Sequence, residues 1–64
     1  MYKYQEIIIT DNFTKKISFK TYNAAIHDIN FWVNRCKENG YKYMQFKIID
    51  KGTKKELFAG KFSW

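Results

Sequence analysis

This sequence has no proline, and it has only one cysteine, one histidine and one arginine. A single cysteine excludes an intramolecular disulfide. Cys36 and His27 cannot form a zinc site by themselves, because such a site takes three or four ligands at close spacing. The three glycines stand apart, at positions 40, 52 and 60, so there is no glycine-rich phosphate-binding loop. We expect neither a metal ion nor a cofactor.

Long apolar runs are also missing. The longest run, Ile7 to Ile9, falls far short of the ~20 residues that a membrane-spanning helix needs. The first residues, MYKYQEIIIT, lack the basic stretch and the apolar core of a signal peptide. A single unpaired thiol suits a reducing compartment. These features predict a soluble cytoplasmic protein that does not enter a membrane.

Aromatic residues, in contrast, are abundant: the chain has six Phe, five Tyr and two Trp. A chain of this length forms one domain, residues 1–64, and buries only about 60% of its unfolded surface. Aromatic side chains bury large areas and can build a core without disulfides. A small domain cannot easily bury this number of aromatic side chains. We therefore expect some of them on the surface, where a cluster would indicate an interface.

The charge is one-sided, with twelve Lys and Arg residues against six acids and a net charge of +6. Positive charge favours a nucleic-acid partner. The composition offers a second explanation, because residues with AT-rich codons (Lys, Ile, Asn, Tyr and Phe) make up 35 of the 64 positions. Arginine, which binds phosphate and guanine with two hydrogen bonds, occurs once. Both explanations stay open.

Aromatic and β-branched residues predict two strands in the first part of the chain, over Tyr2–Thr10 and around Ile17–Phe19. They form a hairpin whose turn lies within Asp11–Lys15. In the next segment the apolar residues repeat with the period of an α-helix, which predicts a helix from about Tyr22 to Glu38. Its expected N-cap is Thr21, with Asn23 as the alternative, and Gly40 is the expected stop. One apolar stripe of this helix holds Tyr22, Ala25, Ile26, Ile29, Trp32, Val33 and Cys36.

The last part of the chain predicts two more strands, Tyr41–Asp50 and Glu56–Trp64, with a turn at Lys51 and Gly52. Gly60 indicates a bulge or a close approach of another segment. One face of the third strand carries Met44, Phe46 and Ile48, and the other carries Tyr41, Tyr43, Gln45 and Lys47. One face of the fourth strand carries Phe58, Gly60, Phe62 and Trp64.

The order of these elements predicts an α+β fold, ββαββ. Its four-stranded, mostly antiparallel sheet has one helix packed across one face. One helix cannot cover both faces of the sheet. If Met44, Phe46 and Ile48 face the helix, the other face shows a half-polar surface. That surface would consist of Tyr41, Tyr43, Gln45, Lys47 and Lys61.

Phe31 lies outside the apolar stripe of the helix, at about 200° on the helical wheel from Ile29. A single exposed apolar residue is common and needs no function. The alternative is an aromatic anchor in a polar surround, because such residues carry much of the binding energy of an interface. The candidate partner-binding residues are therefore Phe31, Arg35, His27 and Asn34.

No residues have the spacing of a catalytic site. His27 and Cys36 fall on opposite sides of the predicted helix, at about 160° and 340°, so they cannot act as a nucleophile and its base. The acids are scattered, and only Glu6 and Glu56 could meet across strands. A domain of this size also lacks room for a deep pocket. We expect that the protein is not an enzyme.

Three functions remain. The first, which we favour, is a protein-binding module of the kind that phages use to block a larger machine such as a host defence enzyme. A chain of charge +6 cannot mimic DNA, so it would act by steric blocking or by plugging an acidic surface. The second is nucleic-acid binding through stacking tyrosines and nearby lysines, namely Tyr41, Tyr43, Lys42, Lys47 and Lys61. The third, compatible with both, is a homodimer joined through open faces or sheet edges.

Overall fold

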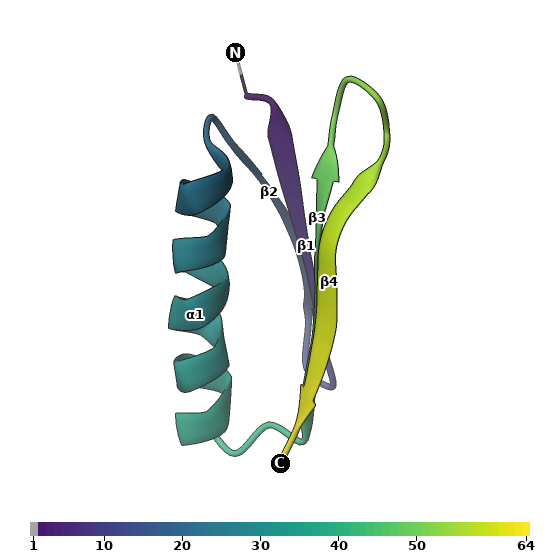
Figure 1. The fold of residues 1–64 in the computed structure, drawn as a ribbon. Coiled ribbons are helices and arrows are strands. Elements are labelled where there is room, and N and C mark those ends of the chain that lie inside the picture. Colours follow the sequence, from purple (N-terminus) through teal and green to yellow (C-terminus); the bar gives the residue numbers. More distant parts are fainter. Residues whose placement is uncertain (1) are drawn as a thin grey trace.

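The computed structural model describes residues 2–64 and confirms the predicted α+β fold. Its elements are β1 (Tyr4–Thr10), β2 (Thr14–Phe19), α1 (Tyr22–Glu38), β3 (Tyr43–Asp50) and β4 (Glu56–Ser63). The four strands form one antiparallel sheet in the order β2-β1-β3-β4, and α1 lies along one face of it (Figure 1). Within residues 2–64, no helix is both long and apolar enough to cross a lipid bilayer.

The two central strands supply much of the core, because their side chains alternate between the two faces of the sheet. On β3, Met44, Phe46 and Ile48 are buried beneath α1, as predicted. β1 pairs Ile8 with Phe46 and Glu6 with Ile48, so all of these side chains lie on the same face. We call this face the inner face and the opposite one the open face.

The helix begins and ends where the sequence predicts. Thr21 is the N-cap, and its Oγ1 accepts a hydrogen bond of 3.1 Å from the Ala24 N–H. Gly40 follows the helix with a φ of 76°, a conformation that residues with a Cβ rarely adopt. The Tyr41 N–H then donates to the Cys36 carbonyl. The residues of the predicted apolar stripe all lie in the core or against it.

Short polar side chains close both hairpins at the predicted turns. Thr10 Oγ1 accepts hydrogen bonds from the N–H groups of Asn12 and Phe13, at 3.0 and 2.9 Å. In the second hairpin, Asp50 Oδ1 accepts a hydrogen bond of 2.8 Å from the Gly52 N–H. These local bonds satisfy the backbone donors of the turns and fix the register of the strands on either side.

One predicted side-chain position is wrong. Tyr41 was expected on the open face with Tyr43, but β3 begins only at Tyr43. Tyr41 instead packs against the core, with its ring edge-on to Phe13 at a centroid distance of 5.9 Å. The chain reverses direction after Gly40, so the two-residue alternation of a strand does not extend back to Tyr41.

The helix covers only part of the inner face. It packs on β1, β2 and β3, whereas every residue of β4 except Gly60 is exposed. A helix is about 10 Å across and neighbouring strands lie about 4.8 Å apart, so one helix covers roughly two to three strands. β4 lies at the edge of the sheet, beyond that cover.

Gly60 marks a close approach rather than a bulge, and the register shift of β4 lies near its start. A Cβ built on Gly60 would lie 2.6 Å from Cζ of Phe46, so the missing side chain leaves room for that ring. The rings of Phe58 and Phe62 stack against Phe46 at centroid distances of 5.6 and 5.7 Å. Gly60 therefore allows three phenylalanine rings to lie side by side.

Candidate binding surfaces

The single cysteine and the single histidine are kept apart by α1. Cys36 is fully buried, and burial, with a smaller contribution from the charge of Asp11, raises the pKa of its thiol. His27 is exposed on the opposite side of the helix. Among the residues that the structure describes, no three His, Cys, Asp or Glu side chains are grouped so that they could hold a metal ion.

A buried carboxyl pair connects α1 to the sheet. Glu6 lies on the inner face of β1 with no exposed surface, and its carboxyl group faces that of Asp28 on α1. Within residues 2–64, no N–H or hydroxyl group donates to either Glu6 oxygen or to Asp28 Oδ2. The two carboxyl groups can form a hydrogen bond with each other only when one of them carries a proton.

This pair holds its proton at neutral pH. Desolvation, followed by the hydrogen bond and the negative charge of Asp28, raises the pKa of Glu6 from 4.5 to about 8, and Lys15 opposes the rise. Glu6 and Glu56, which the sequence allowed to meet across strands, do not meet, because β3 separates their strands and Glu56 lies on the open face. The Glu6 carboxyl group is buried and Asp28 is half-buried, so the pair links α1 to β1 beneath the surface.

The predicted partner-binding residues are all exposed on α1. We call these four residues, His27, Phe31, Asn34 and Arg35, the helix patch. The ring of Phe31 is 54% exposed, and the Arg35 guanidinium carbon lies 5.9 Å from its centroid. The Trp32 ring meets it edge to face at 5.5 Å. Phe31 is thus an aromatic ring held between a cation and a second aromatic ring.

Trp32, which supports Phe31, is itself fixed against the first hairpin. Lys15 Nζ of β2 lies 3.9 Å from the centroid of the Trp32 ring. Phe13 packs edge-on against the same ring at 5.6 Å. The core packing of Trp32 therefore extends, through one ring contact, to the exposed ring of Phe31.

A second exposed aromatic surface lies on β4 and just beyond it. We call Phe58, Phe62 and Trp64 the aromatic row. Their exposed fractions are 38, 44 and 42%, although they lie on the inner face, where α1 does not reach them. The rings of Phe62 and Trp64 are nearly parallel, at 8°, with centroids 6.2 Å apart. Phe58 and Phe62 stack on Phe46, which is itself buried, so the row is joined to the core at this edge of the sheet.

The open face brings together part of the predicted nucleic-acid site. Tyr43, Lys47 and Lys61 lie on it, with Lys61 Nζ 5.2 Å from the centroid of the Tyr43 ring. Lys42 is exposed but precedes β3. Since Tyr41 belongs to the core, only one of the two predicted stacking tyrosines remains on this face.

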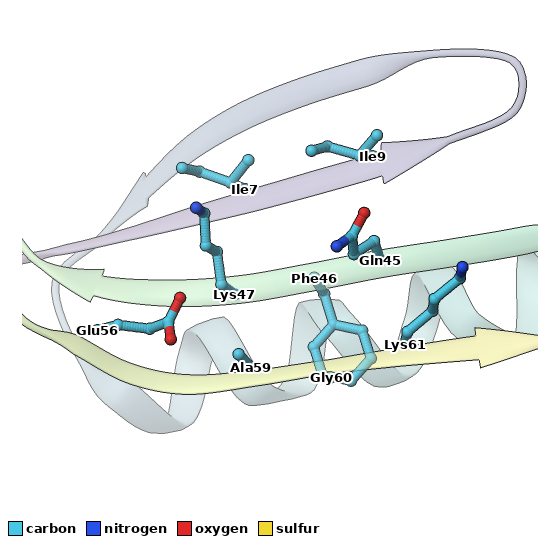
Figure 2. A pocket seen from close by; sticks show the side chains of 9 residues that line it. All are labelled: Ile7, Ile9, Gln45, Phe46, Lys47, Glu56, Ala59, Gly60 and Lys61. Atoms are coloured by element: carbon cyan, nitrogen blue, oxygen red, sulfur yellow. The ribbon is translucent and has the colours of Figure 1, made fainter.

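A shallow hollow of about 380 Å³ lies on the same face (Figure 2). Its floor is apolar, formed by Ile7 and Ile9 of β1 and by Ala59 of β4. Charged and polar side chains surround it, namely Gln45, Lys47, Glu56 and Lys61. The hollow opens broadly to solvent, so it is a depression in a surface rather than an enclosed ligand pocket.

Sequence reasoning missed two of these features. The burial of Glu6 could have been predicted from the sequence, because Glu6 alternates with Ile8 and Thr10 and so lies on the same face as they do. The exposure of the aromatic row could be predicted only in part. A single helix is too narrow to cover four strands, but the sequence does not show which strand is left uncovered.

Comparison of the chain with protein-family models, with curated proteins and with solved structures finds no match. Its function is therefore argued from its own residues and surfaces.

Proposed function

We propose that this chain is a non-enzymatic, cytoplasmic protein-binding module that blocks or regulates a larger macromolecular machine, as small phage inhibitors do. We assign the contact with that partner to the helix patch. The observation that carries this proposal is the ring of Phe31, which is 54% exposed and lies against Trp32 and Arg35. The apolar stripe that holds α1 on the sheet does not include this ring.

The geometry of Phe31 suits an anchor for another protein. Aromatic and arginine residues are enriched among those that contribute most to binding energy, and they act best inside a polar rim. Here Phe31 and Arg35 are in contact, and His27 and Asn34 supply exposed polar groups beside them. Because Trp32 already restricts the ring of Phe31, less conformational entropy is lost when a partner covers it.

The charge of the chain indicates the kind of surface to which it would bind. Twelve basic residues against six acidic ones favour a partner with an acidic patch. Lysine supplies eleven of these cations. Long-range attraction would then speed association, while the aromatic contact at Phe31 would set the lifetime of the complex.

The test compares matched variants of the helix. Immobilised wild-type protein, Phe31→Ala and Asn30→Ala are incubated with an extract of cells that produce the chain, and a specific partner is identified by its retention. With that partner purified, Phe31→Ala should weaken binding by about 2 kcal/mol, which is roughly 30-fold. Asn30→Ala, an exposed substitution on the same helix, should bind like wild type. Equal binding by all three proteins would refute the assignment of the helix patch.

Nucleic-acid binding remains the second candidate, supported by the cluster of Tyr43, Lys47 and Lys61 on the open face. Under this alternative, a labelled mixed-sequence oligonucleotide should bind at low salt and be released as salt rises. Tyr43→Ala combined with Lys47→Ala should weaken that binding more than Tyr43→Ala combined with Lys37→Ala, which removes the same charge from α1. No binding at low salt would exclude this candidate.

A further inference from the structure

We propose that β4 pairs with β4 of a second copy of this chain, in an antiparallel register centred on Gly60. The two sheets then form one continuous sheet in a homodimer. This interface uses the aromatic row and the free edge of β4, and it is separate from the helix patch.

The first argument is the mismatch between the composition of β4 and its surroundings. Its inner face carries Phe58 and Phe62, and Trp64 follows them, yet these side chains are 38, 44 and 42% exposed. The α1 helix packs over the other three strands. An exposed apolar row along an unpaired strand edge is the surface that proteins usually cover or interrupt.

The second argument is the direction of the backbone groups. The Trp64 N–H donates to the Lys42 carbonyl, which lies across from it toward β3. Successive residues of a strand point their N–H and C=O groups to opposite edges, so those of Ala59, Lys61 and Ser63 point away from β3. These groups form a free antiparallel edge that is ready to pair with another strand.

The third argument is that β4 is complementary to itself in one register. When Gly60 lies opposite Gly60 of the second copy, Phe58 lies opposite Phe62 on the inner face, and it does so twice by symmetry. Ala59 then lies opposite Lys61, and each such pair can exchange two backbone hydrogen bonds. Cross-strand aromatic pairs of this kind stabilise a sheet.

The neighbouring registers are less favourable, which selects this one. A shift in one direction sets Phe58 against Trp64, but it also sets Lys61 against Lys61 of the second copy and Phe62 against Gly60. A shift in the other direction sets Phe58 against Gly60. Either shift loses both of the direct Phe58–Phe62 pairs, and the first also opposes two like charges. The phenylalanines on either side of Gly60, together with the repulsion between two Lys61 side chains in the shifted register, thus favour the register centred on Gly60.

The net charge of +6 on each copy adds a testable feature. Two such chains repel one another, so added salt should strengthen the dimer by screening this repulsion. Binding to nucleic acid has the opposite dependence on salt. In the proposed dimer both α1 helices lie on the same side of the joined sheet, because the symmetry axis is perpendicular to it.

The experiment measures the mass of the pure protein by sedimentation equilibrium, from low micromolar to millimolar concentration, at low and high salt. We expect a monomer–dimer equilibrium that shifts toward dimer as salt rises. A wild-type chain that stays monomeric up to millimolar concentration overturns the proposal. The aromatic row would then be covered by another protein or left exposed. The measurement involves no other partner, so it does not depend on the proposed function.

Matched proline substitutions at the two edges of the sheet locate the interface. Ala59→Pro removes an N–H that points away from β3 and should raise the dimer dissociation constant at least about tenfold. Lys16→Pro removes an equivalent N–H at the free edge of β2, because the Thr10 N–H bond to Phe13 orients residues 14, 16 and 18 outward. It should leave the constant unchanged. Dimers that survive Ala59→Pro, or that are lost in Lys16→Pro, contradict the proposal.

Two further measurements keep the proposal testable if a proline variant fails to fold. Phe62→Lys places a charge in the aromatic row and should weaken the dimer by about tenfold or more. In the wild-type protein, the Lys61 amide should exchange its hydrogen slowly at high concentration and quickly at low concentration. An amide that exchanges quickly at every concentration, or a Phe62→Lys variant that dimerises like wild type, overturns the pairing of β4.

Discussion

The inner faces of β1 and β4 have opposite environments. β1 places Glu6, Ile8 and Thr10 on this face, and β4 places Phe58, Gly60 and Phe62 there, so the more apolar strand is the more exposed one. Ile8 of β1 has no exposed surface, whereas Phe62 of β4 is 44% exposed. β1 lies between two strands and beneath α1, while β4 has one neighbouring strand and lies beyond the helix. The position of a strand in the sheet, and not its apolar pattern alone, therefore decides how much of that pattern is buried.

The strongest test of this comparison is the substitution Ile8→Ala. The side chain is fully buried between α1 and the sheet, so its loss removes apolar contacts and leaves a cavity. We expect the free energy of unfolding to fall by about 3 kcal/mol, measured by denaturant titration. A fall below about 1 kcal/mol would mean that the core is not centred on β1.

A second test uses the polar group that β1 buries on its inner face. Glu6 faces Asp28 of α1, with Lys15 of β2 nearby, and its pKa is raised from 4.5 to about 8. The folded chain then binds a proton that the unfolded chain has lost, so stability falls as pH rises from about 5 to about 8. We expect the free energy of unfolding to fall by on the order of 2 kcal/mol across this range. The fall should be smaller than the whole pKa shift of Glu6 would give, because water can reach the carboxyl group when the structure opens locally.

The matched variant for this measurement is Glu6→Gln. Its amide can donate to Asp28 without a titrating proton, so the stability of the variant should change much less between pH 5 and pH 8. A wild-type chain whose stability rises over this interval, or a variant with the same pH dependence as wild type, would show that Glu6 is ionised in the fold.

On β4, a substitution at Gly60 should lower the free energy of unfolding more than one at any other position. A Cβ there would lie 2.6 Å from Cζ of Phe46, a ring that is packed between Phe58 and Phe62. Gly60→Ala should therefore lower the free energy of unfolding by roughly 1 to 2 kcal/mol. Gly52→Ala, whose added Cβ meets only Asp50 Oδ1 at 3.3 Å, is the control and should have a smaller effect on thermal unfolding.

The smallest effect should come from Phe62→Ala in dilute solution. The side chain keeps 44% of its surface exposed in the single chain, so less than about 1 kcal/mol of stability should be lost. At high concentration the proposed pairing of β4 predicts a larger loss, because a dimeric wild-type protein would gain stability from association. Equal losses for Phe62→Ala and Ile8→Ala in dilute solution would contradict the comparison of the two strands.

The elements of this fold were predictable because local signals agree along the chain. Thr21, Gly40 and the turn residues define where elements begin and end, and the apolar stripe shows which side of α1 packs. The exposure of Phe31 followed from the same stripe. These features depend on neighbours close in sequence, which a single sequence displays directly.

The features that the sequence did not predict depend on contacts between segments that are distant in the chain. The strand order β2-β1-β3-β4 leaves β4 uncovered, and no local pattern specifies that order. The partner of Glu6 lies on α1, not on the strand that a pairing of acids across the sheet suggested. Tyr41 shows the same limit at shorter range, because the turn after Gly40 interrupts the alternation that placed it on the open face.

The carboxyl pair of Glu6 and Asp28 also makes folding a reaction with a solvent species. With the pKa of Glu6 raised to about 8, each chain that folds near neutral pH should take up roughly one proton, and each chain that unfolds should return it to the buffer. The heat of unfolding seen in a calorimeter then includes the heat of protonating the buffer. It should be smaller in Tris, which releases much heat on protonation, than in phosphate, so two buffers at one pH can count the buried proton.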